Sequence, residues 1–566
     1  MKRYDVIVAG GGTAGVFAAL AAAGDGMSVL MLEKTTACGG IGTNGAVAPY
    51  YDRNDLRLSA ELDAQVLKQQ TGSGFLLPLK DDCAAPELLK GAFENALKQK
   101  GVRIIYQAVV TGVCKDGSRV TGVSWHDPAG NHTAGSGAVI DATGDGTLLF
   151  LAGAEFLPAN EMEHACQPYA RIFTYCAYGR IWNYGGDAGY TDPADPENFS
   201  AECLRSAAAQ LPERFEETEK RFCYAPVPGI REGRHLRGRQ TIRFSEVIRG
   251  IQHPEPVAWE YANFDTHTVD LAFEADDVFL FSVAAMQWST GMNIAIPAGA
   301  LIPEGVDGII AAGRMLSADH AASQAVRMKG CMKHLGAVAG IMAASAVKNC
   351  KPVAAVHADE ITARFPLPPA GKMLQDNENL RLKDPEEIKN ALRRKNPGTA
   401  IWSAYLLGQK EYLYSLLDEP DFAGTHAAFA LAILQDKSAL AVLRELARRR
   451  DMTKSETGRN EPLRECHGAI AVYLLGFLDD TESFSLLQDI FMEKKDFFFT
   501  VAAWRSILRL SSKHPHLLEP GRQIIRQFVD SADSIPCFNC YCGEVYDATG
   551  KMKNLSAVWL KQKIDW

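Results

Sequence analysis

The 566-residue sequence lacks several features that mark common classes of protein. No run of about 18 apolar residues occurs, so no membrane-spanning helix is expected. Lys and Arg total 59 against 68 Asp and Glu, and the net charge of −9 gives no electrostatic basis for nucleic-acid binding. The 13 cysteines are scattered and odd in number, which favours reduced thiols in a cytoplasmic protein. A secretory signal is not expected, because the first apolar strand begins directly after Arg3.

One close group of cysteines near the C-terminus raises the question of a metal site. Cys537, Cys540 and Cys542 stand in the run CFNCYC, and three thiols need a further ligand to hold one zinc ion or cluster. No histidine follows Cys537 in the sequence. We therefore favour free cysteines that pack on neighbouring helices, and no metal is expected.

Glycine, with 49 residues, is plentiful, and its first cluster lies in YDVIVAGGGTAGVFAALAAAGDGMSVLMLEK. This segment predicts a strand, a glycine loop, a helix, a second strand and an acid, at residues 4–9, 10–15, 16–23, 29–32 and 33. An apolar strand that runs into Gly-x-Gly-x-x-Gly, with an acid about twenty residues further on, is typical of a βαβ dinucleotide-binding fold.

Each part of this loop has a physical role. Gly10 permits a tight turn, Gly12 lets the backbone approach a pyrophosphate, and Gly15 lets the helix pack closely on the strand. The amides at the start of the helix, including those of Thr13 and Ala14, act with the helix dipole to stabilise phosphate charge. The loop therefore predicts a site for the phosphates of a dinucleotide.

The choice of dinucleotide depends on the acid and on the strands beyond it. Glu33 can accept hydrogen bonds from the adenosine ribose hydroxyls and would repel a 2′-phosphate, so NADP is not expected. The chain then returns to apolar strands that end in glycine, at 142–146 and again at 311–314. The flavin half of a larger dinucleotide lies far from the first loop and needs contacts from such later strand ends. The sequence therefore favours FAD over NAD.

With these motifs the chain resembles FAD-dependent oxidoreductases of the fumarate reductase/succinate dehydrogenase flavoprotein superfamily. It is most similar to a bacterial branch that carries an RExR element and an AGR…S…H…S…R element, and the resemblance covers about residues 1–350. It implies that a helix N-terminus at Gln324 to Val326 faces the flavin. The FAD contacts that it implies, with Val109 included, are Gly10, Gly12, Thr13, Ala14, Gly15, Glu33, Lys34, Gly39, Gly40, Thr43, Val109, Ala142, Thr143, Gly144, Asp145, Gly313, Arg314, Gln324, Ala325 and Val326.

Two departures from relatives shape the expected chemistry. The branch that binds FAD covalently uses a histidine in the glycine-rich segment, and no histidine occurs from Lys34 to Asp52. FAD is therefore expected to be non-covalent. No second Gly-x-Gly-x-x-Gly unit occurs, so a dedicated NADPH domain is not expected and a separate electron donor or acceptor must complete the cycle.

The most charged stretch, PGIREGRHLRGRQTI, is the candidate substrate site. A charged stretch by itself is typical of a solvated surface, but the resemblance places this element over the flavin, where arginine forks bind carboxylate or polyol oxygens. We interpret Arg231, with Arg234 or His235, as pointing inward. The candidate catalytic residues are Arg231, Arg234, His235 and His320. His164 is a weaker candidate for acid–base catalysis, and Arg327 either lines the same cavity or pairs with an acid.

The expected fold class is an α/β Rossmann-like FAD-binding domain with an inserted α+β substrate domain, followed by an all-α HEAT-like domain. A long helix is expected from about 323 to 348. Four segments after residue 398 resemble one another as helix pairs, and a plain helical bundle is the alternative. The expected boundaries are 1–156 and 291–350 for the FAD-binding domain, 157–290 for the substrate domain, 351–398 for a linker with helices, 399–530 for the helical repeats and 531–566 for a C-terminal tail.

The function that these features favour is an FAD-dependent oxidoreductase. It would transfer a hydride between flavin N5 and a small polar metabolite, such as a carboxylate or a sugar. The alternative is a flavin-binding redox sensor or scaffold whose helical repeats recruit a protein partner or a second copy of the chain. The arginine–histidine element favours the enzyme, since a sensor need not retain such an array.

Overall fold

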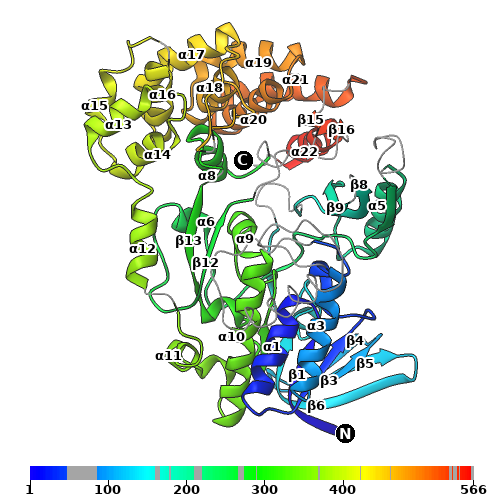
Figure 1. Cartoon of the computed structure of the whole chain (residues 1–566). Coiled ribbons are helices and arrows are strands. Elements are labelled where there is room, and N and C mark those ends of the chain that lie inside the picture. The colour runs from blue at the N-terminus through cyan, green and yellow to red at the C-terminus, as the bar shows by residue number, and fades with distance from the viewer. Residues whose placement is uncertain are drawn as a thin grey trace. The chain divides into compact units, whose positions relative to one another are not determined.

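The computed structural model describes residues 1–47, 86–159, 166–177, 180–209, 220–265, 273–288, 290–367, 370–420, 422–458, 460–533, 538–539, 545–546 and 548–562. The described residues form two compact units (Figure 1). The first unit comprises those within 1–160, 164–262 and 291–374, and the second comprises those within 263–290 and 375–566. The expected substrate region is thus divided, because 263–290 clusters with the C-terminal helices. The predicted domain limits themselves stay a prediction.

The core of the first unit is a seven-stranded sheet of order β3-β2-β1-β6-β5-β4, with β14 also paired to β6. β1 lies parallel to β2 and β6, while β5 lies antiparallel to β6 and β4. Buried Ile7, Leu30, Val139 and Ile309 fill the core along these strands. The strands span Lys2–Ala9 (β1), Val29–Glu33 (β2), Arg103–Tyr106 (β3), Val109–Asp116 (β4), Arg119–Asp127 (β5), Gly130–Asp141 (β6) and Ile309–Ala311 (β14).

Two helices rich in small residues lie together beside this sheet. α1 (Thr13–Gly24) packs along α10 (Lys329–Lys348), and a Cβ at Gly336 or Gly340 would collide with backbone oxygens of α1. By length and composition α10 could cross a membrane. However, 94% of its most apolar 18-residue stretch is buried inside the protein, as in a core helix. A third helix, α3 (Pro86–Gln99), contacts α1 through Phe93 and Phe17.

The long helix expected from about 323 to 348 is interrupted. α9 (His320–Val326) has Arg327 as its C-cap, and Met328 is extended, with φ −64° and ψ 153°, before α10 begins. The expectation of one continuous helix is therefore wrong. Residues 324–326 form the end of a short helix rather than the N-terminus of a long one, because the chain turns between the two helices.

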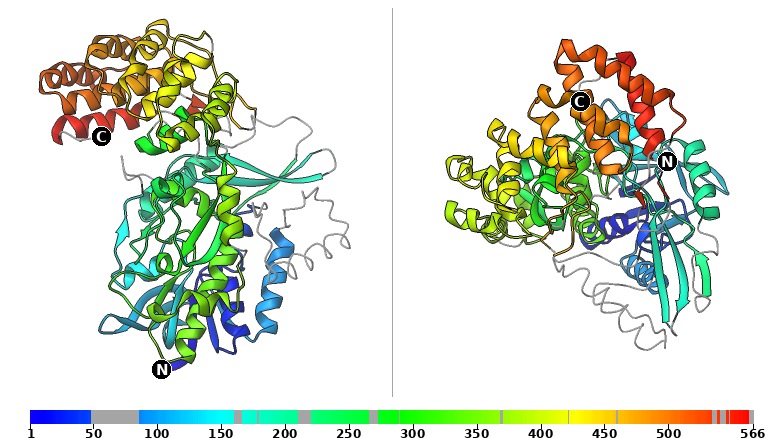
Figure 2. Two further views of the ribbon diagram at one scale, coloured as in Figure 1. Left: turned by 90° about the vertical axis from the view of Figure 1, so that its left-hand side faces the viewer. Right: turned by 90° about the horizontal axis from the view of Figure 1, so that it is seen from above.

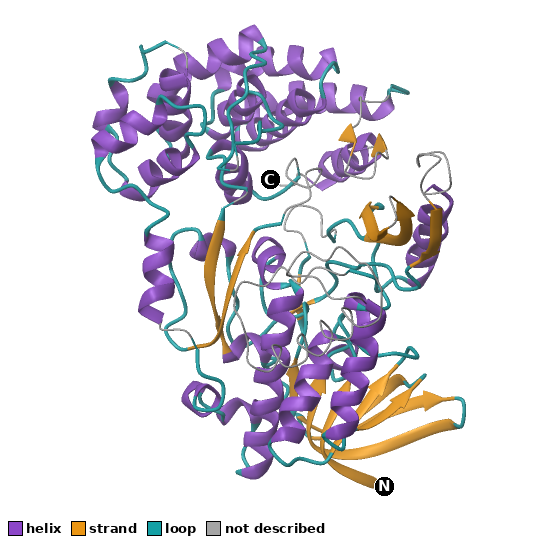
Figure 3. Cartoon of the chain, in the orientation of Figure 1, coloured by secondary structure: helices purple, strands orange, loops and turns teal. Residues whose placement is uncertain are grey.

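The described part of the first unit also contains three smaller sheets and further helices (Figure 3). β8, β9 and β10 form an antiparallel sheet of order β10-β8-β9, β11 pairs with β7, and β12 pairs with β13. Their bounds, with those of two helices, are Thr147–Leu151 (α4), Phe156–Leu157 (β7), Ala170–Ala177 (β8), Arg180–Asp187 (β9), Pro196–Ala209 (α5), Lys220–Tyr224 (β10), His235–Leu236 (β11), Pro256–Asn263 (β12) and Gly291–Pro297 (β13).

The second unit consists almost entirely of helices where it is described (Figures 2 and 3). α18 and α19 both pack against α20, which also packs against α21. This is an all-α arrangement, and its division into repeats stays a prediction. The main helices span Pro385–Leu392 (α13), Gly398–Leu407 (α14), Phe422–Ile433 (α16), Leu440–Arg449 (α17), His467–Phe477 (α18), Phe484–Glu493 (α19), Phe497–Lys513 (α20), Pro515–Asp530 (α21) and Ala548–Gln562 (α22).

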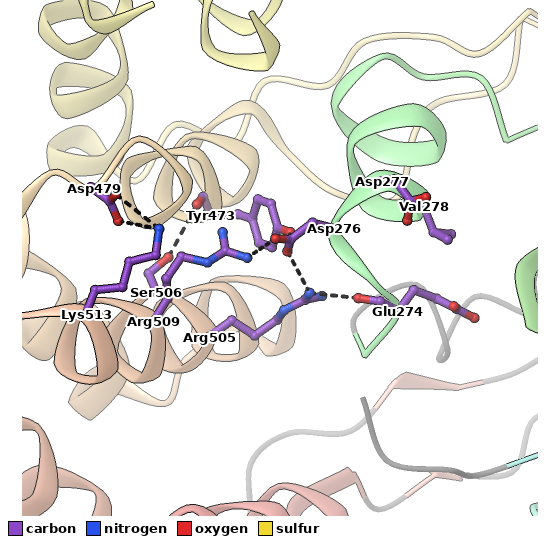
Figure 4. A network of polar contacts seen from close by, with 10 residues as sticks. All are labelled: Glu274, Asp276, Asp277, Val278, Tyr473, Asp479, Arg505, Ser506, Arg509 and Lys513. Carbon is purple, nitrogen blue, oxygen red and sulfur yellow. Dashed lines mark hydrogen bonds and ion pairs between the residues drawn. The ribbon is translucent and has the colours of Figure 1, made fainter. Parts of the chain in front are cut away.

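A segment from the middle of the chain is part of this helical unit. Asp276, at the start of α8 (Asp276–Phe279), accepts hydrogen bonds from Tyr473 of α18 and from Arg509 of α20 (Figure 4). Arg505 also donates a hydrogen bond to the Glu274 carbonyl, with an N–O distance of 2.7 Å. A chain that ended near residue 350 would leave this segment without the helices that it contacts.

Candidate active site

The glycine loop lies at the carboxyl end of β1 and leads directly into α1. Gly10 has a φ of +94°, and a Cβ there would collide with the Ala142 carbonyl, so only glycine fits this turn. A Cβ at Gly15 would meet the Gly10 carbonyl oxygen and would lie 3.1 Å from the Ala142 Cβ. Gly12 is the N-cap of α1, and no side chain caps this helix end. The uncapped first-turn amides fit the anion expected here.

The acid at the end of β2 lies against this loop. The Glu33 carboxylate is buried, and its Oε2 accepts a hydrogen bond from the Gly11 amide at 2.5 Å while its Oε1 accepts two from Thr35. Each carboxylate oxygen has two lone pairs, so the group can also accept from ribose hydroxyls. The placement fits the predicted role, and the structure adds a second one, because Glu33 also fixes the glycine loop.

The second glycine-rich segment runs beside the first. The Gly39 amide donates a hydrogen bond to the Gly11 carbonyl at 2.7 Å, and Gly39 and Gly40 both have positive φ. Thr43 is buried and its hydroxyl donates to the Cys38 carbonyl at 2.6 Å, so this hydroxyl fixes the loop. Lys34 is exposed. The predicted cofactor segment is therefore adjacent to the first loop.

Cys38 lies in the same segment, and its environment makes the thiol unreactive near neutral pH. Its thiol is fully buried, and burial, which outweighs the hydrogen bond with Tyr106, raises its pKa to about 12. A thiol with this pKa stays protonated near neutral pH and is a poor nucleophile.

The two later motifs meet at the carboxyl ends of β6 and β14. Arg314 donates to Asp145, with an N–O distance of 2.5 Å, and Asp145 therefore neutralises the arginine of the AGR element. Gly144 has a φ of +89°, and a Cβ there would lie 2.9 Å from the Arg314 guanidinium. Thr143 donates to the buried Asp141 at 2.7 Å and fixes this turn. The predicted residues at 142–145 and 313–314 are thus brought together.

The arginine element contacts these motifs, but not in the predicted way. Residues 230–234 form no strand, so side chains do not alternate between faces there. Arg231 is paired with Asp187 at 2.8 Å and donates to the Pro168 carbonyl. Arg234 donates to the Asp145 carbonyl at 3.2 Å and lies over the Phe150 ring. Each arginine thus contacts a protein oxygen through one guanidinium nitrogen.

The outer members of the same element lie on the surface. Arg237 and Arg239 are exposed, as a solvated charged stretch would be. His164 and the three cysteines at 537, 540 and 542 lie outside the described residues. Among the residues that the structure does describe, no group of three or more His, Cys, Asp or Glu side chains could hold a metal ion.

A buried carboxylate organises the centre of the site. Glu232 Oε1 lies 2.6 Å from His235 Nε2 and 2.8 Å from His320 Nδ1, and its Oε2 accepts a hydrogen bond from the Gln167 amide at 2.8 Å. All four residues are buried. Gly233, directly after Glu232, lies so close to Asp145 that a Cβ would come within 2.5 Å of its Oδ1. The cluster therefore adjoins the cofactor motifs.

The charges in this cluster are coupled. Burial by itself would raise the pKa of Glu232, but His320 and His235 outweigh burial and lower the pKa to about 2. Glu232 is thus ionised across the physiological range, and both histidines donate a proton to it. The neighbouring Cys166 thiol has a raised pKa, first through burial and then through the charge of Glu232.

His235 and His320 were predicted from the sequence as catalytic candidates, whereas no role was predicted for Glu232 or Gln167. The position of Glu232, three residues before His235 in the motif, could have indicated a carboxylate partner for that histidine. Gln167 gave no such signal, because its contact with Glu232 spans 65 residues. His235 and His320 are brought together, which the sequence alone did not require.

Residues 5–222 and 200–365 match the family described as FAD dependent oxidoreductase. The chain belongs to this family. FAD is therefore its cofactor, and this FAD dependent oxidoreductase requires a small-molecule substrate and an electron donor or acceptor. The α1 amides, the positive φ of Gly10 and the buried acid at Glu33 beside the glycine loop are features that FAD needs, so the described residues fit the cofactor.

A curated relative is digeranylgeranylglycerophospholipid reductase 1 of Methanococcoides burtonii, which is 32% identical over 157 residues. The match covers 25% of this chain and 38% of that relative, so the chain spans well under half the length of the relative.

Solved structures are similar to this chain only at a low level. A geranylgeranyl bacteriochlorophyll reductase-like protein from Thermoplasma acidophilum has a TM-score of 0.35 at 12% identity, over 79% of this chain and 99% of its own. L-proline dehydrogenase from P. horikoshii has a TM-score of 0.31 at 13% identity, over 62% of this chain and 94% of its own. These values are too low to support any argument about this FAD dependent oxidoreductase.

The remaining predicted contacts differ in how well the structure places them for FAD. Val109 begins β4 and is 53% exposed, one residue after Ala108, whose amide donates to the Glu33 carbonyl at 3.0 Å. Gln324, Ala325 and Val326 are buried in the last turn of α9. Their predicted place at a helix N-terminus is wrong, because α9 ends there.

Proposed function

We propose that this FAD dependent oxidoreductase transfers a hydride between flavin N5 and a carbon atom of a small polar metabolite, either a carboxylate or a sugar-like compound. The observation that carries the proposal is the buried Glu232–His235–His320 cluster beside Asp145 and Arg314. A redox reaction at a carbinol or similar carbon needs a group that takes or supplies one proton. This cluster supplies such a group next to the cofactor motifs.

FAD, when bound, supplies two-electron chemistry by accepting or donating a hydride. The protein residues then hold the substrate and handle the proton. His235 donates its Nε2 proton to Glu232, which fixes the ring and its tautomer. Nδ1 of the same ring is buried and has no hydrogen-bond partner within the part of the chain that the structure describes. We assign this atom as the proton acceptor in the direction of substrate oxidation.

Glu232 is a positioning residue in this scheme. It holds His235 and His320 with one oxygen, and it stabilises the positive charge that appears when either ring takes a proton. Since its pKa is about 2, its negative charge is present throughout the pH range in which histidines titrate. The proton taken by His235 is thus compensated without any movement of a counter-ion.

Finer features of the chain are part of the same proposal. FAD is held without a covalent bond, which the absence of histidine from Lys34 to Asp52 supports. The chain falls in the fumarate reductase superfamily branch, and the helices of the second unit are HEAT-like repeats. The protein works in the cytoplasm, which seven free cysteines among the described residues support.

The test is anaerobic stopped-flow reduction of the bound flavin with a panel of alcohols, sugars and acids. At least one compound should bleach the yellow absorbance. His235→Gln should then lower the limiting rate of reduction about 10²–10⁴-fold while FAD remains bound. Arg239→Gln, at an exposed position of the same element, is the matched control and should leave the rate unchanged. If the substrate reduces the flavin of the His235→Gln protein as fast as that of the unaltered protein, the role assigned to His235 is wrong.

A further inference from the structure

The face of α10 that packs on α1 continues to a lysine at the start of α10. Gly336 of α10 lies against Ala14 of α1, and four residues further along each helix Gly340 lies against Ala18. The two helices therefore run side by side in the same direction (Figure 1). Lys329 precedes Gly336 by seven residues, which is about two helical turns, so both residues lie on the same face of α10.

This lysine lies beyond the N-terminus of α1. Thr13, the first residue of α1, precedes Ala14 by one residue only, so α10 extends about 9 Å past that end of α1. The first-turn amides of α1 point in this direction. Gly12 is the N-cap, and among the described residues no atom lies within 4 Å of the place that a Cβ on Gly12 would take. An anion that binds the α1 amides has room there.

The Lys329 side chain is buried close to this end of α1. It is 8% exposed, and its Nζ donates a hydrogen bond to the Val47 carbonyl at 2.5 Å. A Cβ on Gly42 would lie 3.7 Å from Lys329 Nζ and 3.4 Å from Thr13 Oγ1. The ammonium group of Lys329 and the first hydroxyl of α1 therefore both lie within 4 Å of one point beside the glycine loops.

We propose that Lys329 binds the diphosphate of FAD. The diphosphate is a dianion, whereas the N-terminus of a helix is equivalent to only about half an elementary positive charge. A buried ammonium group adds a full positive charge where water screens it less than at the surface. Because an ammonium group has three N–H donors, Lys329 can bind a phosphate oxygen and keep its hydrogen bond to the Val47 carbonyl. This role does not depend on which substrate reacts with the flavin.

The test begins with Lys329→Gln, which removes the charge but keeps an N–H donor for the Val47 carbonyl. The Kd for FAD is measured by dilution of the full-length holoprotein, since released flavin becomes more fluorescent. The variant should raise this Kd about ten- to hundredfold, as expected for the loss of a hydrogen bond between charged groups. Lys329→Arg, which keeps the charge, should restore most of the affinity. Lys348→Gln, at the exposed far end of α10, is the control and should leave the Kd unchanged.

Two further measurements separate a contact with the diphosphate from other roles of Lys329. Sodium chloride should weaken FAD binding less in Lys329→Gln than in the unaltered protein, because the variant lacks the charge that salt screens. A contact with the diphosphate is the same in oxidised and reduced FAD, so the midpoint potential of the flavin should not change.

Three results would overturn the proposal. A lowered midpoint potential with an unchanged Kd would place the charge at the flavin ring instead. Equal losses of affinity in Lys329→Gln and Lys329→Arg would show that the shape of the side chain matters rather than its charge. An unchanged Kd and an unchanged potential in Lys329→Gln would leave Lys329 only as an anchor for the Val47 carbonyl.

Discussion

The ion cluster of the helical unit allows a matched test of what a buried charge contributes to stability. Asp276 pairs with Arg505 and Arg509, whose side chains are 7% and 8% exposed, and its own side chain is 36% exposed. A second pair nearby in Figure 4, Lys513 with Asp479, has a carboxylate of the same exposure, 36%, but a lysine that is 50% exposed. The two pairs therefore differ mainly in how deeply the cation is buried.

Asp276→Asn removes the charge and keeps the shape of the side chain. Burial would raise the pKa of Asp276, but Arg509 and Arg505 outweigh it and lower the pKa, so the carboxylate is ionised at neutral pH. Loss of one partner of a buried ion pair costs about 3–5 kcal/mol, and the partial exposure of Asp276 reduces our expectation to about 2–3 kcal/mol. Asp479→Asn should cost less than about 1 kcal/mol.

The assay is urea unfolding monitored by tryptophan fluorescence. Trp504 is fully buried, and the centroid of its ring lies 6.0 Å from that of Phe273, in the segment that includes Asp276. Adding Arg509→Met to Asp276→Asn should cost less than the sum of the single changes, because both remove the same pair. Flavin fluorescence reports the first unit separately. Equal losses for Asp276→Asn and Asp479→Asn would refute the argument that the buried arginines require this carboxylate.

Two further predictions concern a close backbone contact and acid stability. Gly15→Ala should lower the free energy of unfolding by about 1–3 kcal/mol and release most of the FAD, because the added Cβ would meet the Gly10 carbonyl. Gly24→Ala is the control, since nothing lies close to a Cβ at that position of the same helix, and it should retain FAD. The measurement is the flavin content of the purified proteins. Burial lowers the pKa of His426 to about 3 and that of His467 to about 4. Below about pH 6.5 the unfolded chain therefore binds protons that the folded protein does not. The free energy of unfolding should be about 1–2 kcal/mol lower per histidine at pH 5 than at pH values well above 6.5. His467→Gln should move the acid midpoint of unfolding to lower pH, and exposed His126→Gln should not; an unmoved midpoint in the former would contradict this reasoning.

The sequence by itself determined the first βαβ element and its cofactor. Strand, glycine loop, helix and acid are neighbours along the chain, so local geometry fixes their arrangement. These motifs were sufficient to indicate an FAD dependent oxidoreductase. The histidines at 235 and 320 were also identifiable as acid–base candidates. Local patterns such as these need no knowledge of distant contacts.

Only the tertiary structure decided which charged groups serve the site. Glu232 meets His320 across 88 residues and the Gln167 amide across 65, and no local pattern records contacts at such separations. Arg231 and Arg234, predicted as substrate ligands from the sequence, also contact protein oxygens that no local pattern revealed, and their role toward a substrate stays a prediction. Whether a charged side chain can bind a ligand depends on which buried groups of opposite charge it already contacts. Those contacts depend on how remote segments pack.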